Sequence, residues 1–144
     1  MNTWAALETP LKEAPEFFVE GPDKEKHLSE RQRCTLFLQL MRIAAPAVDV
    51  FHISNEGKRS PYVARSIGIR SGVFDYCCTW RGKGVAWIEF KGFDSRKRPG
   101  VLSANQISWG NRQLRKGHDV ACFFTPELAV KWLRECGAPV GQIR

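Results

Sequence analysis

The sequence contains no apolar run near the ~18 residues that a membrane-spanning helix needs. Its N-terminus also lacks the basic and then apolar pattern of a secretion signal. We therefore expect an intracellular, cytoplasmic protein with no membrane partner. Internal repeats and low-complexity tracts are missing as well, and 144 residues suffice for one domain with a sizeable core.

The sequence also lacks the cysteine and histidine patterns that are typical of zinc sites and of disulfide-bonded domains. The five cysteines include no CxxC pair, and an odd number does not suit a disulfide framework. We expect reduced thiols, mostly in the core, at Cys34, Cys77, Cys78, Cys122 and Cys136. The three histidines are dispersed. His118 follows a glycine before an expected strand, which favours a structural role, whereas His52 stays open as an imidazole base.

Acidic residues are few outside the N-terminal part of the chain. Residues 1–27 hold six acids and three bases, whereas residues 28–144 hold nine acids and nineteen bases, a net charge of +10 within a chain total of +7. A basic body favours a polyanionic partner. A membrane surface is the rival explanation, and the absence of apolar segments disfavours it.

This boundary predicts an N-terminal arm, residues 1–27, and a single folded domain, residues 28–144. The arm contains Pro10, Pro15 and Pro22 between short apolar islands. We expect it to be irregular and to pack on the body or on a partner, with disorder as the alternative.

Periodicity and capping signals give the elements of the body. Ser29 and Gln32 form a capping-box pattern that opens a helix over about 29–45, and Ser103 opens a second helix that runs to Lys116. The other expected elements are a strand near 48–53, a basic loop 54–71, a hairpin 73–91, a basic loop 92–100, a strand 119–124 and a helix from 125 to 137. This order predicts an α/β fold with a mixed central sheet flanked by helices.

The hairpin carries the groups that a metal-dependent phosphodiester-cutting site needs. Glu89 and Lys91 lie two residues apart in a strand, so their side chains share a face, while Ile88 and Phe90 point into the core. Antiparallel pairing brings Asp75 beside Glu89. Two carboxylates on one face favour a hard cation, Mg²⁺ or Mn²⁺. The lysine supplies a fixed positive charge that can act on the attacking water or the phosphate.

Simpler explanations exist for each residue taken alone. Glu89 and Lys91 can be an ordinary ion pair on a solvated strand face. An acid such as Glu30 is favoured in the first turn of a helix by the helix dipole, and Gln106 can be a capping or solvent-facing amide. Trp87 shares the face of Glu89 and is a candidate for the substrate surface.

Five segments in order give these residues a common context. They are the helix opened by Ser29-Glu30, the loop 55–60, Gly72-Val73-Phe74-Asp75, Ile88-Glu89-Phe90-Lys91, and Leu102-Ser103-Ala104-Asn105-Gln106 followed by Trp109. Together they resemble the virus-type replication-repair nucleases (VRR-NUC), a branch of the PD-(D/E)XK nuclease superfamily. The resemblance covers most of 29–139. One departure is that Phe74, and not proline, precedes Asp75.

The resemblance implies a PD-(D/E)XK restriction-endonuclease-like core and a role for each matched residue. Asp75, Glu89 and the backbone carbonyl of Phe90 would bind the metal, and Lys91 would be the catalytic lysine. Gln106 from one helix and Glu30 from another would complete the site. For DNA binding we expect basic residues of the two loops: Lys58, Arg59, Arg96, Lys97 and Arg98.

The expected function is a Mg²⁺- or Mn²⁺-dependent DNA endonuclease. Standalone members of the family resemble Holliday-junction resolvases, which implies a homodimer acting on branched DNA and is compatible with a phage-encoded origin in a bacterial host. A nuclease acting on flaps or on specific duplex sequences is one alternative. A basic DNA-binding protein with an inactive nuclease fold is another.

Overall fold

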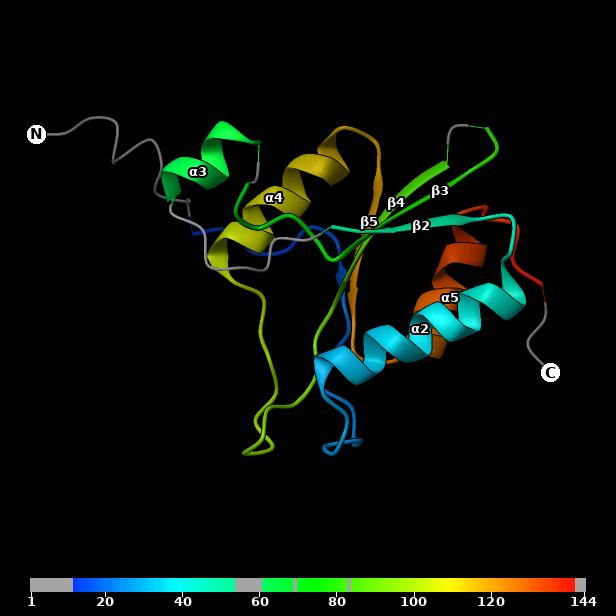
Figure 1. The fold of residues 1–144 in the computed structure, drawn as a ribbon, viewed down its shortest axis with the longest axis horizontal. Coiled ribbons are helices and arrows are strands. Elements are labelled where there is room, and N and C mark those ends of the chain that lie inside the picture. The colour runs from blue at the N-terminus through cyan, green and yellow to red at the C-terminus, as the bar shows by residue number, and fades with distance from the viewer. Residues whose placement is uncertain (1–11, 54–60, 69, 83, 142–144) are drawn as a thin grey trace, which may run out of the picture.

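The structure is a computed structural model that describes residues 12–53, 61–68, 70–82 and 84–141. Within these residues one open sheet of five strands runs through the molecule (Figure 1), in the order β1-β5-β4-β3-β2. β1 and β4 both pair parallel to β5, whereas β3 pairs antiparallel to β4 and to β2. The bounds are Phe18–Val19 for β1, Asp49–His52 for β2, Tyr76–Trp80 for β3, Gly84–Phe90 for β4 and Asp119–Phe123 for β5.

Helices cover both faces of this sheet. α2 (Glu30–Ala44) and α5 (Pro126–Glu135) lie on one face, and α4 (Ala104–Arg115) lies on the other (Figure 1). β4 is therefore packed on both sides. Ile88 and Phe90 join the core under α2 and α5, while Trp87 packs with Trp109 of α4. The predicted α/β class and mixed sheet are confirmed.

Local sequence signals place the long helices well. α2 and α4 both begin with a complete capping box, Ser29 with Gln32 and Ser103 with Gln106, in which each serine accepts from the glutamine N–H and each glutamine side chain accepts from the serine N–H. Two of the free backbone donors at each helix start are thereby satisfied. A short helix, α3 (Pro61–Ser66), lies in the segment that was expected to be loop.

The described part of the N-terminal arm packs on the body, as expected, and is irregular except for one short strand. Its residues Phe18–Val19 form β1, parallel to β5, and Phe17 is buried against Phe74 with ring centroids 5.5 Å apart. Glu20 then accepts hydrogen bonds from the N–H groups of Phe124 and Thr125, each at 2.8 Å, at the start of α5. From residue 12 onward the described arm is thus built into the sheet and its helices.

None of the helices in the described part of the chain combines the length and the apolarity needed to cross a bilayer.

Candidate metal centre

The β3–β4 hairpin brings Asp75 and Glu89 together. The register pairs Tyr76 with Ile88, which places the residue before β3 beside Glu89. Two hydrogen bonds then cross between the strands: the Asp75 N–H donates to Glu89 Oε2 at 2.9 Å, and the Phe90 N–H donates to Asp75 Oδ2 at 3.1 Å. Backbone donors thus hold both carboxylates in fixed orientations, as the expected antiparallel pairing requires.

The N-termini of two helices, α2 and α4, lie close to this pair of carboxylates. Each helix start packs against a glycine of the neighbouring segment, where no larger residue fits. A Cβ on Gly92 would lie 2.2 Å from the backbone nitrogen of Glu30, so the chain just after Lys91 passes directly beside the start of α2. A Cβ on Gly72, whose φ is +88°, would lie 2.5 Å from the carbonyl oxygen of Asn105 at the start of α4. These close approaches bring Glu30 and Gln106, the first-turn residues of the two helices, to the site.

Gln106 connects the helix cap to the charged residues. Its Oε1 accepts from the Ser103 N–H at 3.0 Å, which fixes the orientation of the amide, and it also accepts from Lys91 Nζ at 3.1 Å. Its Nε2 therefore faces Glu89 Oε1 and donates to it at 2.8 Å. Lys91 Nζ lies 3.6 Å from the same carboxylate oxygen. Glu89, Lys91 and Gln106 form one hydrogen-bonded group.

Three carboxylates face one another in this site. Glu30, Asp75 and Glu89 each offer an oxygen, and these oxygens all lie within 4.8 Å of one another. They line an open cavity of about 350 Å³ together with Lys91 and Gln106. Three carboxylate oxygens this close together could hold a metal ion. The role of the Phe90 carbonyl as a ligand stays a prediction.

Burial makes the charge on these carboxylates costly. The Glu89 side chain is almost inaccessible to solvent. Burial, and next the negative charge of Asp75, raise the pKa of Glu89 to about 8, against a smaller lowering by Lys91. Burial also raises the pKa of Asp75. A cation between the carboxylates would offset both penalties, because it stabilises the ionised forms.

We expect the metal-free protein to lose stability as the pH rises. Since the pKa of Glu89 is raised from 4.5 to about 8, the folded state binds more protons than the unfolded state between these values. Stability therefore falls through this window, by about 4 kcal/mol between about pH 5 and pH 8.5, or roughly 8–16 °C in Tm. Thermal unfolding in a chelator measures the fall.

The control for this expectation is Glu89→Gln, which removes the titrating group and should flatten the profile. Added Mn²⁺ should restore most of the loss in the unsubstituted protein. A profile that rises between these pH values in chelator would contradict the assigned environment of Glu89.

The predicted DNA-binding residues fall into two groups. Lys58 and Arg59 lie outside the described residues. Arg96, Lys97 and Arg98 are all exposed on the loop 92–100, which starts directly after Lys91 and ends before Val101, itself a wall of the carboxylate cavity. The loop that carries this group therefore begins and ends beside the site.

Two of the aromatic and histidine candidates contribute to the fold. Trp87 packs edge-on against Trp109, with centroids 4.9 Å apart, and its Nε1–H donates to Nδ1 of His118 at 3.2 Å. These contacts give Trp87 a packing role, and its part in a substrate surface stays a prediction.

The five cysteines are all free, as expected.

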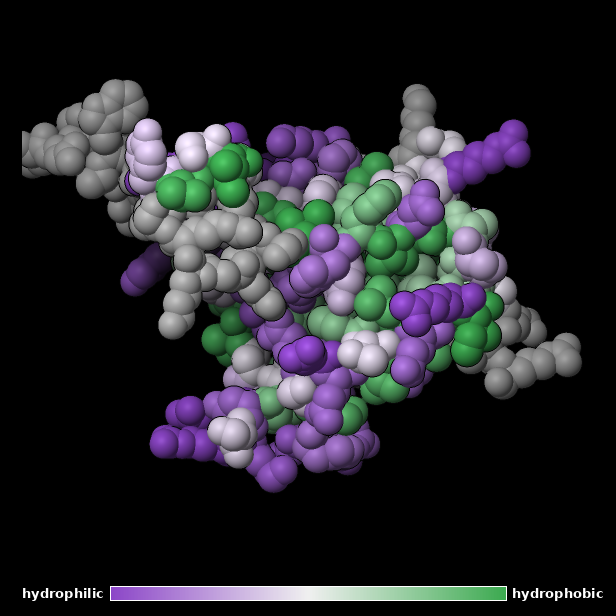
Figure 2. Space-filling view, in the orientation of Figure 1, coloured by the Kyte–Doolittle hydropathy of each residue, from purple (hydrophilic) through white to green (hydrophobic). Residues whose placement is uncertain are grey.

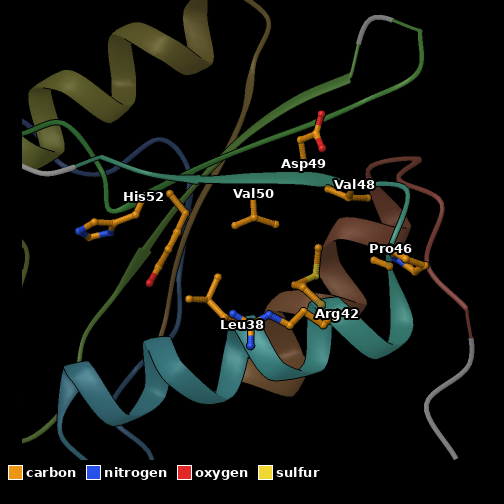
Figure 3. A pocket seen from close by; sticks show the side chains of 10 residues that line it. Leu38, Arg42, Pro46, Val48, Asp49, Val50 and His52 are labelled. Carbon is orange, nitrogen blue, oxygen red and sulfur yellow. The ribbon is translucent and has the colours of Figure 1, made fainter.

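His52 opens onto a different pocket. That pocket, of about 490 Å³, lies between α2 and β2 (Figure 3) and is lined by apolar residues with Arg42, Asp49 and His52 at its rim. Its lining contains none of the three clustered carboxylates. The larger pocket is therefore separate from the carboxylate cluster, although His52, which lines it, is near enough to Asp75 to be one of the smaller influences that lower the pKa of Asp75.

The sequence alone did not identify the residues that position the site. Gly72 and Gly92 are needed for the approach of the two helices, and in the sequence they look like ordinary turn glycines. The Ser-x-x-Gln pattern was a usable signal for the helix start, but the second role of its glutamine depends on tertiary structure.

Comparison of the chain with protein-family models, with curated proteins and with solved structures gives no match.

Proposed function

We propose that this chain is a metal-dependent nuclease with a PD-(D/E)XK-type core of the VRR-NUC kind. The observation that carries the proposal is the hydrogen-bonded group of Glu89, Lys91 and Gln106 beside Asp75, with Glu30 completing a three-carboxylate cluster. An incidental ion pair on a strand face would be exposed, whereas Lys91 and Glu89 have side chains only 12% and 3% exposed. Such burial of charge around an open cavity is typical of a functional site.

The residues present suit a hard divalent cation. Asp75 and Glu89 would hold it, with Glu30 and the Phe90 carbonyl as further oxygen donors. Once bound, Mg²⁺ or Mn²⁺ would lower the pKa of a water ligand and neutralise charge on the phosphate. The donor set is entirely oxygen, which disfavours zinc.

The chain's own groups have separate tasks in this proposal. Lys91 donates from its ammonium to a phosphate oxygen or to the attacking water, and so stabilises the negative charge that develops in the transition state. Gln106 holds Lys91 and Glu89 at fixed positions through its two amide atoms. Lys91 and Glu89 then need little rearrangement during the reaction.

DNA is the proposed substrate. The excess of bases over acids in residues 28–144 favours a polyanion. No separate recognition domain accompanies the site in the described residues, so recognition of shape and backbone is favoured over base readout. By the resemblance, we propose a homodimer that presents two sites to branched DNA. Light scattering at micromolar protein concentration tests the pairing, and a strict monomer would remove it.

The test of function is an activity panel. Labelled linear duplex, flap, splayed-arm and four-way DNA are incubated with the protein in chelator, in Mg²⁺ and in Mn²⁺. We expect cutting only with metal, and preferentially of the branched substrates. Binding in chelator without cutting in either metal would favour the alternative, a DNA-binding protein with an inactive nuclease fold.

A further inference from the structure

Two loops extend from the candidate site on the same end of the molecule. The loop 22–28 leads into Ser29 and Glu30, and the loop 92–100 follows Lys91. The Phe93 N–H donates to the Leu28 carbonyl at 3.1 Å, so the two loops are joined at their bases. Figure 1 shows them as the two projections below the start of α2, and Figure 2 shows hydrophilic side chains gathered there.

Arg33 of α2 fixes both loops from within. Its side chain is fully buried and donates to both carboxylate oxygens of Asp23, at 2.6 and 2.9 Å, and to the carbonyls of Glu25, Leu28 and Phe124. Its guanidinium also lies 5.7 Å from the centroid of Phe93. Bidentate pairing of this kind defines geometry as well as energy. The loop of the arm is therefore held rigidly beside the loop of the body.

The acids of the two loops are engaged in local contacts. Asp23 is paired with Arg33, and Glu25 lies 3.5 Å from His27. Asp94 accepts from the N–H groups of Arg96 and Arg98, each at 2.9 Å, and pairs with the Arg98 side chain at 2.9 Å. Asp94 thus shapes the turn and takes up part of the charge of Arg98.

The remaining cations point outward. Lys24, Lys26, Arg96 and Lys97 are exposed, and no hydrogen bond or ion pair joins their side chains to any other residue that the structure describes. Lys97 has a φ of +60°, a conformation that glycine or asparagine adopts more readily. Because lysine is not the residue best suited to this backbone conformation, its presence indicates that its charge is used and not its turn-forming propensity.

We propose that loops 22–28 and 92–100 form one surface that binds the phosphodiester backbone of the DNA beside the cut, with Lys24, Lys26, Arg96 and Lys97 as its contacts. This rests on the proposed function. It assigns two lysines of the acidic arm to the substrate surface, because Asp23, the acid next to Lys24, is neutralised by the buried Arg33. A flexible polyanion attracted by net charge alone would depend equally on basic residues anywhere on the protein. Binding at the proposed surface depends on the cations at this one end.

The test compares the salt dependence of DNA binding in chelator, where cutting does not interfere. One variant carries Lys24→Gln and Lys26→Gln, and a second carries Arg96→Gln and Lys97→Asn. Each should reduce the slope of log K against log salt by about 1.8 and weaken binding ten-fold or more at ~0.1 M salt. The matched control, Arg81→Gln with Lys116→Gln, removes two exposed charges at the β3–β4 turn and at the far end of α4.

The control should change the slope by less than about 0.5. Equal slopes for the control and for either loop variant would overturn the assignment, as would poly-glutamate binding as tight as duplex binding at equal charge. Thermal unfolding of each variant checks that a reduced salt dependence of binding does not come from partial unfolding of the protein. Failure of the proposed function has a different signature, namely tight DNA binding that no metal converts into cutting.

Discussion

Replacing Lys91 by alanine is expected to reduce DNA cutting by about a hundred- to a thousand-fold while leaving Mn²⁺ binding intact. An ammonium group has three donors and no acceptor, so Lys91 cannot be a metal ligand. Its place 3.1 Å from Gln106 Oε1 and 3.6 Å from Glu89 Oε1 suits a group that acts on the phosphate or the water. Asp75→Asn, in contrast, should lose both metal binding and cutting, because it removes a charged oxygen donor.

The measurement needs a defined pH. Lys91 lowers the pKa of Glu89, so its removal makes Glu89 harder to ionise. Titration calorimetry with Mn²⁺ at about pH 8.5 limits this indirect effect, since Glu89 then loses its proton more readily in both proteins. Lys116→Ala, at the far end of α4, is the control for loss of a lysine. If Lys91→Ala lost Mn²⁺ as completely as Asp75→Asn does, the separate roles assigned to these residues would be wrong.

The pairing of Asp75 with Glu89 could be predicted because two short-range rules determine it. Strand alternation fixes the face that Glu89 shares with Lys91, and the turn of the hairpin fixes the register that brings Asp75 beside Glu89. The bonds from the Asp75 N–H and the Phe90 N–H bear out the pairing, and the 3.6 Å between Lys91 Nζ and Glu89 Oε1 bears out the shared face. Predictions that depend only on residues close together in one hairpin therefore agree with the structure at the level of individual contacts.

Packing of the arm on the body was expected, but its short strand and its individual contacts could not be predicted, because those contacts span the whole chain. β1 has only two residues, too few for any periodic signal. Glu20 caps α5 across 105 positions at Thr125, and Glu13 accepts from the buried Asn111 across 98. The surplus of acids in residues 1–27 suggested a separate segment. In the structure several of these acids, with Asp23 among them, instead fasten the arm to the basic body.

The approach of the helices to the site lies between these two cases. The capping boxes of α2 and α4 are local and were predicted. The close contacts of Gly92 and Gly72 with the two helix starts, in contrast, join residues that are distant in the chain. Local rules therefore placed Glu30 and Gln106 in first turns, and only the packing of helix against strand places them beside Glu89.

The two capping boxes allow the role of Gln106 to be separated from its helix-capping role. Gln106→Glu keeps an oxygen that accepts from the Ser103 N–H, so the cap of α4 is retained. It replaces the Nε2–H that donates to Glu89 Oε1 by a second oxygen, which repels Glu89 and competes for Lys91. We expect cutting to fall by about a hundred-fold. Gln32→Glu makes the same substitution in the box of α2, where the side chain is exposed.

This control should retain both cutting and stability, because an acid in the first turn of a helix is favoured by the dipole. Cutting rates at matched pH and thermal unfolding in chelator measure the difference between the two variants. The Tm of Gln106→Glu should fall more steeply with rising pH than that of the unsubstituted protein, since added negative charge raises the pKa of Glu89 further. If Gln106→Glu cut DNA as well as Gln32→Glu, Gln106 would be a capping residue alone, and Lys91 would have to be oriented by Glu89 without it.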